Sequence, residues 1–398
     1  MYSSTALSFL LSPNFAVHSS VECTREDNVC ALPEETSLRF FVLGDFGGSS
    51  KPPHTTLVQL AVAKQVDQLS EVFHPHFFVE AGDNFYDKGV ENVKSPRFKA
   101  TFDDVYNYGK DRKVPWYIVA GNHDHRSNVT AQLEYTKVNP RWVFPNLYYF
   151  VRYSFGPADA ATVVDILLLD SMVLQVCMTH AEGIDIKPRT AKRLADAEKS
   201  FLWIKNKLMN SKADFLFVVS HHPLYSLGNH LNNDCLLILG LADLCIKHQV
   251  NAYFAGHNHI LEHTTMTDRF SDANWTVHLV TSGAAAKEDA QVDLPELPLQ
   301  AFPRVVKNVF VFPNENDTTV VEGGYVYVTV DSKKAFVKFY QSDGKHRHTF
   351  STPKRTPDEP ERDATPQGTT PKNNACVRFL FPFYSYMTFI TASLDRLL

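Results

Sequence analysis

Several features that mark particular protein classes are missing from this sequence. None of its six cysteines stands in a CxxC pair, which argues against a zinc knuckle. Lysine and arginine (39) do not outnumber aspartate and glutamate (44), so no basic surface for a nucleic acid is expected. No apolar run reaches the length of a regular transmembrane helix, about 20 residues. What remains is a chain of 398 residues, 44% of them hydrophobic, which is enough for one large domain with terminal extensions.

The cysteines and three glycosylation sequons indicate a secretory compartment. The Asn-x-Ser/Thr sequons begin at Asn128, Asn274 and Asn316. Residues 1–20 contain a short apolar run followed by small residues, and we interpret them as a signal peptide although a basic start is missing. Disulfides form in such compartments, and proximity in the sequence suggests that Cys23 pairs with Cys30. The 17 histidines would make the protein positively charged in an acidic compartment, where it would attract phosphate.

Predicted strands alternate with predicted helices over most of the chain. Strands are expected over 38–43, 77–81, 114–120, 215–219 and 252–255, and helices over 55–70, 96–106, 191–209 and 236–248. This alternation is typical of a mainly parallel sheet with its site at the carboxyl ends of the strands. Strands over 147–155 and 162–169 lack an intervening helix, so part of the sheet should be antiparallel. Strands over 277–282, 324–330 and 335–339 should close a second sheet, with a proline-rich surface loop over 288–322.

Polar side chains follow each of the five alternating strands. They are Asp45, Asp83 with Tyr86, Asn122, His221, and His257 with His259. The segment VAGNHDH at 119–125 is the densest of these groups, and its amide, imidazole and carboxylate groups suit a divalent metal ion. One such group alone could be ordinary turn chemistry. Five in succession along the chain are not expected by chance, so the sequence predicts a metal site at this edge of the sheet.

The order GDxG, GDxxY, GNHD, a strand ending in histidine, and GHxH resembles that of the metallophosphoesterases. Tyr86 narrows the resemblance to the purple acid phosphatases, and the segments 128–133 and HxPxYS at 221–226 are similar to those of the small animal-type, tartrate-resistant members. The resemblance covers roughly 38–340, and the loop after Ser282 departs from the family. It implies an α/β fold, a four-layer αββα sandwich of two mixed sheets. It also implies an acid phosphatase that hydrolyses phosphate monoesters, either small molecules or phosphoproteins.

The resemblance further implies a dinuclear centre. Fe(III) would be held by Asp45, Asp83, Tyr86 and His259, and a divalent iron, zinc or manganese by Asp83, Asn122, His221 and His257. A metal-bound hydroxide would attack phosphorus, since two metals clamp the phosphoryl group and lower the pKa of bound water. His123 and His230 are the candidates for protonating the leaving group. We expect Asp124 to orient His123 and keep it protonated, and His125 to support the ligand loop.

Three further expectations come from the family. His222 stands where members often have an aromatic residue, and both substrate contact and simple exposure in a loop remain open. Cys177 and Cys235 fall where the family carries a disulfide, which would fix the loop of His230. The redox-active iron implies that reactive oxygen species could form as a secondary activity.

The composition divides the chain into four parts. A possible signal peptide (1–20) precedes the metallophosphoesterase catalytic domain (37–350), a disordered Pro/Thr-rich stalk (352–375) and an apolar tail (376–398). The tail is short for a transmembrane helix, and a weak membrane anchor, a signal for lipid attachment and a docking strand are all open. We expect a monomer that is secreted or lysosome-like, with membrane association through the tail as an alternative.

Two other functions fit parts of the sequence. A related metallophosphoesterase with two identical divalent metals would act on diesters or nucleotides, but Tyr86 argues against it. Some relatives with this fold have lost their metal ligands and serve as membrane-anchored attachment proteins, and the stalk and tail fit such a scaffold. The intact ligand set argues against a scaffold, because an attachment protein has no physical need for seven coordinating side chains.

Overall fold

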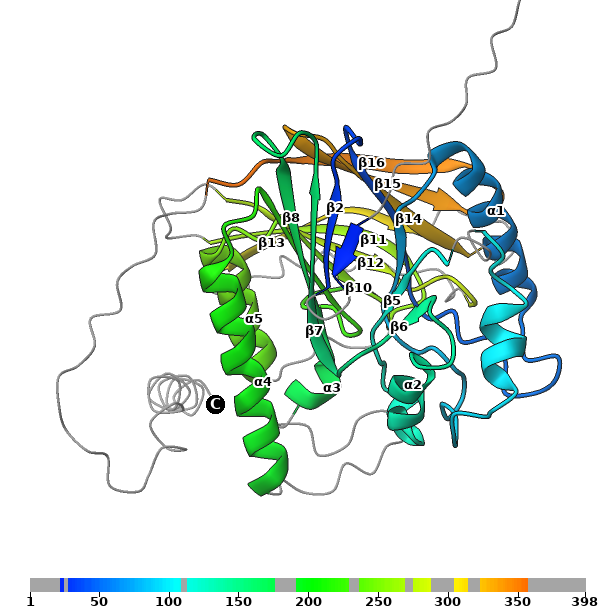
Figure 1. Ribbon diagram of the computed structural model, residues 1–398. Coiled ribbons are helices and arrows are strands. Elements are labelled where there is room, and N and C mark those ends of the chain that lie inside the picture. Colours follow the sequence, from blue (N-terminus) through cyan, green and yellow to red (C-terminus); the bar gives the residue numbers. More distant parts are fainter. Residues whose placement is uncertain are drawn as a thin grey trace, which may run out of the picture. The chain divides into compact units, whose positions relative to one another are not determined.

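Two β-sheets packed face to face organise the computed structural model (Figure 1). It describes residues 22–24, 28–108, 113–175, 191–228, 236–268, 275–287, 304–313 and 323–356. The predicted signal peptide, His230, the proposed Cys177–Cys235 pair, the apolar tail and all but the first residues of the stalk lie outside these ranges. All of the described residues belong to one compact unit, which contains the predicted catalytic domain.

The larger sheet is mixed and has nine strands among the described residues. Their order is β1 (Glu22–Thr24), β2 (Val29–Leu32), β7 (Tyr148–Phe155), β8 (Thr162–Leu169), β9 (Phe215–Ser220), β10 (Ala252–Ala255), β12 (Val277–Ser282), β11 (Leu261–Asp268) and β13 (Arg304–Phe312). β8, β9, β10 and β12 are parallel neighbours, whereas β7 and β8 are antiparallel, as predicted from the missing helix between them.

The smaller sheet is also mixed and has seven strands in the described ranges. Their order is β16 (His346–Pro353), β15 (Lys334–Gln341), β14 (Gly324–Val330), β3 (Leu38–Leu43), β4 (Phe77–Glu80), β5 (Trp116–Ile118) and β6 (Trp142–Val143). β3 to β6 are parallel, so the loops after them leave the same edge of the sheet. The run LRFFVL of β3 is apolar because both of its faces are covered.

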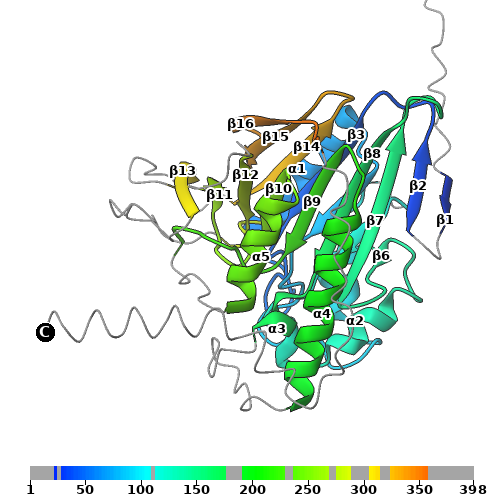
Figure 2. The ribbon, with the colours of Figure 1, turned by 90° about the vertical axis from the view of Figure 1, so that its left-hand side faces the viewer.

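Helices cover the outer faces of both sheets. α1 (Leu57–Phe73) packs on the seven-stranded sheet, where Phe73 lies 6.5 Å from Phe41 of β3 between ring centroids. α4 (Ala191–Asn210) and α5 (Leu236–Lys247) cover the nine-stranded sheet, as Figure 2 shows, and share a hydrophobic cluster with β9. Between the sheets, Phe40 of β3 packs against Phe217 of β9, with ring centroids 6.0 Å apart. The predicted four-layer αββα architecture of two mixed sheets is therefore present.

Short helical segments complete the fold. They are the π-helix η1 (Phe98–Asp103), the 3-10 turn η2 (Asp124–Arg126), and the α-helices α2 (Val129–Tyr135) and α3 (Ser171–Leu174). The helix predicted over 96–106 corresponds to η1, in which the N–H of Asp104 donates to the carbonyl of Lys99, five residues earlier.

Two predictions about the later strands are wrong. The strand over 277–282 does not join those over 324–330 and 335–339, because β12 pairs with β10 and β11 in the nine-stranded sheet. The stretch 288–322 is not a continuous loop, because β13 pairs with β11 as an edge strand. Alternating buried and exposed residues form β13, and the surrounding prolines hid this alternation.

The first residues of the predicted stalk belong to the folded unit. Thr352 and Pro353 are the last residues of β16, and Thr352 is buried. Arg355 is buried as well, and its guanidinium donates to Ser211 Oγ at 3.1 Å and to the carbonyl of His248 at 3.0 Å. A charged residue that is hydrogen-bonded in this way is part of a fixed structure.

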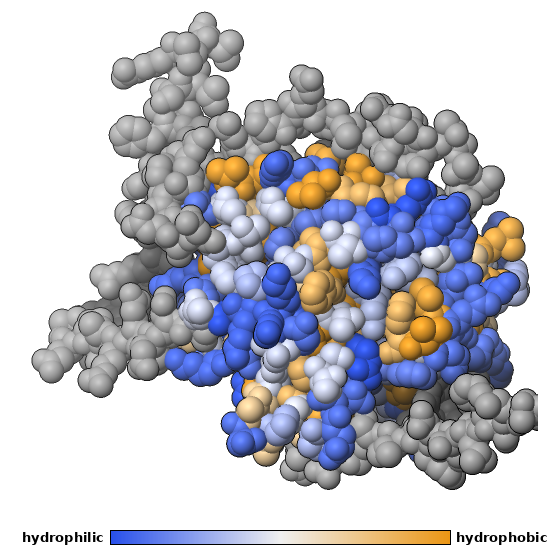
Figure 3. Space-filling model, turned by 90° about the horizontal axis from the view of Figure 1, so that it is seen from above, coloured by the Kyte–Doolittle hydropathy of each residue, from blue (hydrophilic) through white to orange (hydrophobic). Residues whose placement is uncertain are grey.

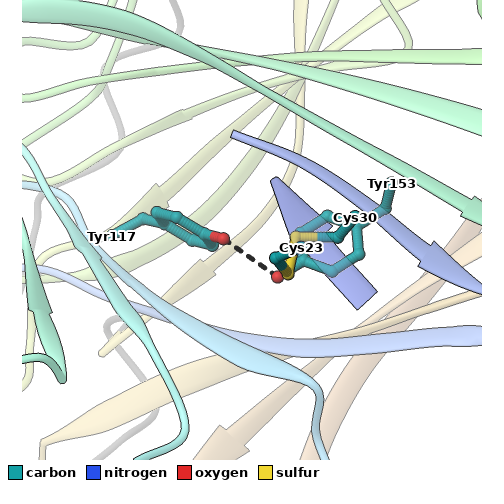
Figure 4. The surroundings of a disulfide bond; sticks show 4 residues. All are labelled: Cys23, Cys30, Tyr117 and Tyr153. Atoms are coloured by element: carbon teal, nitrogen blue, oxygen red, sulfur yellow. Dashed lines mark hydrogen bonds between the residues drawn. A yellow bond between two sulfur atoms is a disulfide. The ribbon is translucent and has the colours of Figure 1, made fainter. Parts of the chain in front are cut away.

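The amino-terminal strands are tied together by a disulfide. The predicted pair Cys23–Cys30 is confirmed, and it joins facing residues of β1 and β2 (Figure 4). Nearby, the hydroxyl groups of Tyr117 and Tyr153 lie 2.9 Å apart, which links β5 of one sheet to β7 of the other. This pair gives the buried hydroxyl groups a partner between the two sheets.

The described surface gives no sign of a large apolar patch on the face drawn in Figure 3. Hydrophobic residues form small groups there among hydrophilic ones. The most exposed large apolar side chains of the described residues, Leu57, Val72 and Val138, are separated in the sequence. Isolated apolar residues are common on protein surfaces. No helix in the described ranges is both long and apolar enough to cross a membrane.

Candidate metal centre

The five predicted strand ends converge between the two sheets. β3, β4 and β5 supply Asp45, Asp83 and Asn122 from the seven-stranded sheet, and β9 and β10 supply His221 and His257 from the nine-stranded sheet. Asp45, Asp83 and His257 have φ angles of 63°, 61° and 71°, in the left-handed region that these residues rarely adopt. Such conformations cluster at functional sites, where the surrounding structure enforces them.

One group of donors contains Asp45, Tyr86 and His259. The Tyr86 hydroxyl donates to Asp45 Oδ1 at 2.8 Å and lies 3.0 Å from His259 Nε2. His259 Nε2 is in turn 3.6 Å from Asp45 Oδ1. The three atoms therefore surround one point, with two oxygens and one imidazole nitrogen directed towards it.

The second group contains Asn122, His221 and His257. His221 Nδ1 lies 2.9 Å from the carbonyl of Ala81, so this nitrogen carries the proton and Nε2 presents a lone pair. That Nε2 lies 3.0 Å from Asn122 Oδ1 and 3.3 Å from His257 Nδ1. In the neutral imidazole, a lone pair therefore faces the amide oxygen, which is also an acceptor. These atoms are of the kinds that bind a divalent cation.

Asp83 lies between the two groups. Its Oδ1 accepts from the backbone N–H of His123 at 2.8 Å and is 3.5 Å from His221 Nε2. Asp45, Asp83 and His221 each offer one ligand atom within 4.8 Å of the others, which connects the two groups through Asp83. Gly121 allows this approach, since a Cβ there would stand 2.2 Å from Asp83 Oδ1.

Burial and mutual charge shape the ionisation of these groups. Burial alone would raise the pKa of Asp45, but the hydrogen bond with His259 and the nearby imidazoles lower it to about 2. Burial alone would lower the pKa of His221, but the carboxylates of Asp83 and Asp45 raise it. Burial, followed by the charge of Asp45, raises the pKa of Tyr86 well above its ordinary value. The negative charge of these buried carboxylates therefore favours the binding of a cation in the site.

The structure contradicts the expected role of Asp124. Its carboxylate does not touch the His123 ring; it accepts from the backbone N–H groups of Gly121 at 2.8 Å and Asn84 at 3.1 Å. The His123 ring is held instead by the carbonyl of Asp87, 2.6 Å from Nδ1. Burial lowers the pKa of His123, so Asp124 does not keep it protonated. Asp124 fixes the ligand loops because its buried oxygens must be satisfied by their N–H groups.

His123 itself lies beside the candidate metal donors. Its Nε2 is 3.7 Å from Asp83 Oδ2, and its ring meets the Tyr86 ring edge-on with centroids 4.6 Å apart. His125 has a different environment, with Nε2 2.6 Å from the buried carboxylate of Asp170. That contact supports the loop, in agreement with the structural role predicted for His125. The second candidate proton donor, His230, is outside the described residues.

His222 is buried, so the alternative of an exposed loop histidine is wrong. Its side chain is 2% exposed, and its Nδ1 lies 2.7 Å from Ser171 Oγ. One ring nitrogen each of His221, His222 and His257 falls within 4.8 Å of the others. His222 therefore adds a third imidazole beside the second donor group.

Sequence reasoning missed two residues near the site. Asn84 Nδ2 donates to the carbonyl of Val119 at 2.9 Å and to Gln132 Oε1 at 3.0 Å, which joins the loops after β4 and β5. Its place inside the GDxxY motif is the sequence signal that could have indicated a role at the site. Lys287 places its ammonium 3.7 Å from the centroid of the Tyr86 ring. No sequence motif points to Lys287, because it follows β12, whose end carries none of the predicted ligands.

The donor chemistry fits two metal ions of different character. Carboxylate and phenol oxygens with one imidazole suit a hard trivalent ion, and the amide oxygen with imidazoles suits a divalent ion such as zinc, iron or manganese. All seven predicted ligand residues are described, and the structure brings them together. Six of the seven are at most 5% exposed, so most of the donor set is desolvated.

Comparisons with known proteins agree with this arrangement. Residues 38–261 match the calcineurin-like phosphoesterase family. The chain is 33% identical to tartrate-resistant acid phosphatase type 5 of Oryctolagus cuniculus over 80% of this chain and 92% of that protein. It is 30% identical to purple acid phosphatase 17 of Arabidopsis thaliana, over 72% and 80% of the two chains. The solved structure of GAP50, the anchor in the inner membrane complex of Plasmodium, is similar with a TM-score of 0.64 at 23% identity, covering 81% of this chain and 90% of that one.

Proposed function

Since the chain belongs to the calcineurin-like phosphoesterases, and within them to the tartrate-resistant and purple acid phosphatases, we propose that it hydrolyses phosphate monoesters at a dinuclear Fe(III)–M(II) centre. Here M(II) is iron, zinc or manganese. The wider assignment, a metal-dependent acid phosphatase, follows from the family. The identity of the two metal ions and the roles of individual residues are the finer part of the proposal.

The convergence of acceptor atoms around His221 carries this proposal. Its Nε2 lone pair faces Asn122 Oδ1 at 3.0 Å, and Asp83 Oδ1 lies 3.5 Å from the same nitrogen. Carboxylate, amide and imidazole groups that are gathered in one buried place are the donor set that a divalent cation prefers. Asp45, Tyr86 and His259 would hold the second cation, and Asp83 would be shared by both ions.

The ligand residues and His123 have different roles in the proposed reaction. When bound, the two ions would neutralise charge on the phosphoryl group and make hydroxide available as the nucleophile at acidic pH. Asp83 and the other six ligand residues would hold these ions. His123 stands beside Asp83 with its ring fixed by the carbonyl of Asp87, and it would deliver a proton to the leaving alkoxide. His230 is proposed as its partner from the sequence.

The proposed compartment and processing come from sequence features. A signal peptide at 1–20, the three sequons and the Cys23–Cys30 disulfide support a secreted or lysosome-like protein. The apolar tail at 376–398 is proposed as a membrane attachment that would coexist with catalysis. The likeness to GAP50 concerns the fold alone and does not favour a scaffold over an enzyme.

The test is the visible absorption spectrum of the purified, oxidised protein, combined with metal analysis and an assay on phosphate monoesters and diesters. We expect a broad charge-transfer band from a tyrosinate bound to Fe(III), and we expect Tyr86→Phe to abolish it. Tyr135→Phe, a buried tyrosine that hydrogen-bonds to Asp103, is the matched control and should retain the band. A colourless protein with two divalent ions and diesterase activity would support the related phosphoesterase instead, and a colourless protein without metal would support a scaffold.

A further inference from the structure

Lys287 forms a contact that neither the family motifs nor the predicted ligand set account for. Its Nζ lies 3.7 Å from the centroid of the Tyr86 ring. Tyr86 is 1% exposed and Lys287 is partly buried, so the contact is shielded from water. A cation over an aromatic face is attracted by the negative charge of the ring, and the attraction is larger when both groups are desolvated.

The backbone next to Lys287 is fixed to the metal-site loops. The carbonyl of Ala286 accepts from Thr56 Oγ1 at 2.6 Å, at the start of α1. The N–H of Ala285 donates to the carbonyl of Gly44 at 3.3 Å, and Gly44 directly precedes Asp45. Since the two residues that precede Lys287 are held, its side chain extends over the Tyr86 ring from a backbone that is anchored on this side.

The other contacts of Tyr86 leave this position to Lys287. The phenol oxygen faces Asp45 and His259, and the ring edge meets His123. Arg97 serves the backbone, because its Nη1 donates to the carbonyl of Tyr86 at 2.7 Å. Lys287 therefore places a cation over the face of a ring whose hydroxyl donates to the carboxylate of Asp45.

We propose that Lys287 tunes the Tyr86 ligand by placing a positive charge over its ring. This inference rests on the proposed function, in which Tyr86 binds Fe(III) as a phenolate. A positive charge over the ring stabilises the phenolate electrons, so moving one of them to iron requires more energy, and the charge-transfer band lies at a shorter wavelength. The phenolate also donates less density to iron, which makes Fe(III) easier to reduce. Lys287 acts through Tyr86 and is a positioning residue.

The test compares the oxidised, metal-loaded Lys287→Met protein with the wild type. We expect the band to move to longer wavelength, because the cation–ring attraction that stabilises the phenolate electrons is lost. The reduction potential of the iron should fall in the same variant. Lys287→Arg retains a cation and should restore the wild-type band. Lys333→Met, which removes an exposed lysine from the turn between β14 and β15, is the matched control and should leave the band unchanged.

Several outcomes would overturn the inference. A band at the wild-type wavelength in Lys287→Met, at equal iron content, would show that the charge has no effect on Tyr86. A shift in Lys287→Arg as large as that in Lys287→Met would show that shape matters and charge does not. Loss of iron from Lys287→Met would assign Lys287 to metal retention. A wild-type protein without the band would refute the proposed iron–tyrosinate centre itself, and is thereby distinguished from a failure at Lys287 alone.

Discussion

Asp83 is the side chain that connects the two groups of metal donors. Its Oδ1 lies 3.5 Å from His221 Nε2, and its neighbours Asp45 and His221 belong to different groups. We predict that Asp83→Ala abolishes hydrolysis and lowers metal content from two ions towards none, because the shared ligand is lost. Metal analysis and turnover of a phosphate monoester check this. Asp159→Ala, which removes an exposed aspartate, is the control. Near-normal turnover in Asp83→Ala would refute the dinuclear proposal.

His123 is placed to protonate a leaving group, and the outcome of its replacement depends on the substrate. We predict that His123→Asn together with His230→Asn slows alkyl phosphates about 100-fold or more, and activated aryl phosphates much less, because an activated leaving group departs without a proton. The measurement is kcat/KM for the two substrate classes. His346→Asn is the control, since His346 is exposed on β16. Equal losses for both classes would remove His123 and His230 as proton donors.

At this scale the sequence predicted which residues meet, and it failed where a contact depends on side-chain direction. The seven ligands follow strand ends, and parallel neighbours place such ends together, so their convergence could be predicted. The partner of His123 could not, because Asp124 is adjacent in sequence but turns towards Gly121 and Asn84. Lys287 lies more than 200 residues from Tyr86 in the chain, and only the packing of the loop after β12 onto β3 brings them together.

Among the elements, β11, β12 and β16 share a row of histidines that are not among the predicted metal ligands. His263 Nδ1 lies 2.9 Å from His348 Nε2, and His263 Nε2 lies 2.9 Å from His278 Nδ1. The row joins the nine-stranded sheet to β16 of the other sheet. Phe350 stacks on the His263 ring with centroids 3.9 Å apart. Three neutral imidazoles can share these two hydrogen bonds, whereas added protons would repel one another.

This row makes stability depend on pH. Burial lowers the pKa of His263 from 6.5 to about 2 and that of His278 to about 4. Below pH 6.5 the unfolded chain therefore binds protons that the folded protein excludes, so the stabilisation is complete above this pH and declines as the pH falls. Between pH 7 and pH 5, one histidine kept neutral costs about 2 kcal/mol of the free energy of unfolding.

We predict that His263→Phe has a smaller loss of unfolding free energy between pH 7 and pH 5 than the wild type, by about 1–2 kcal/mol. Phenylalanine keeps the stacking on Phe350 and cannot be protonated. Urea unfolding at both pH values gives the comparison, and His346→Phe, at an exposed position of β16, is the control. An identical pH dependence in His263→Phe and the wild type would contradict the prediction.

The elements themselves were predicted best where an apolar run is bounded by glycine or a polar loop. The bounds of β3, β8, β12 and β14 agree with the predicted strands. β11 was not predicted because its residues, LEHTTMTD, are mostly polar. The side chains of Glu262 and His263 have hydrogen-bond partners in neighbouring strands. The sheet to which β12 belongs could not be predicted either, since its pairing with β10 is set by packing between segments that are distant in the sequence.

For the whole molecule, the metal centre should be a source of stability. Buried Asp45 and Asp83 face each other's charge, and burial followed by the charge of Asp45 raises the pKa of Glu80 well above its ordinary value. Without a cation, this negative charge opposes folding. We predict that removing the metals lowers the midpoint of thermal unfolding by about 5–10 °C, and that returning them restores it.

Calorimetry of the metal-loaded, stripped and reloaded protein measures this effect. Asp83→Ala is the informative variant, because it should gain little or no stability from added metal. The wild type and Lys333→Met should respond alike. An unchanged midpoint after complete removal of metal would show that the ions do not bind preferentially to the folded state.

The position of β14 has a consequence for biosynthesis. β3, which ends just before Asp45, pairs on one side with β4 and on the other with β14, a strand near the far end of the described chain. At about 5–20 residues per second, the ribosome needs roughly 15–60 s to reach β14 after β3 has emerged. During that interval the edge of β3 that faces β14 has no partner from its own chain, and it is open to pairing with a strand of another chain.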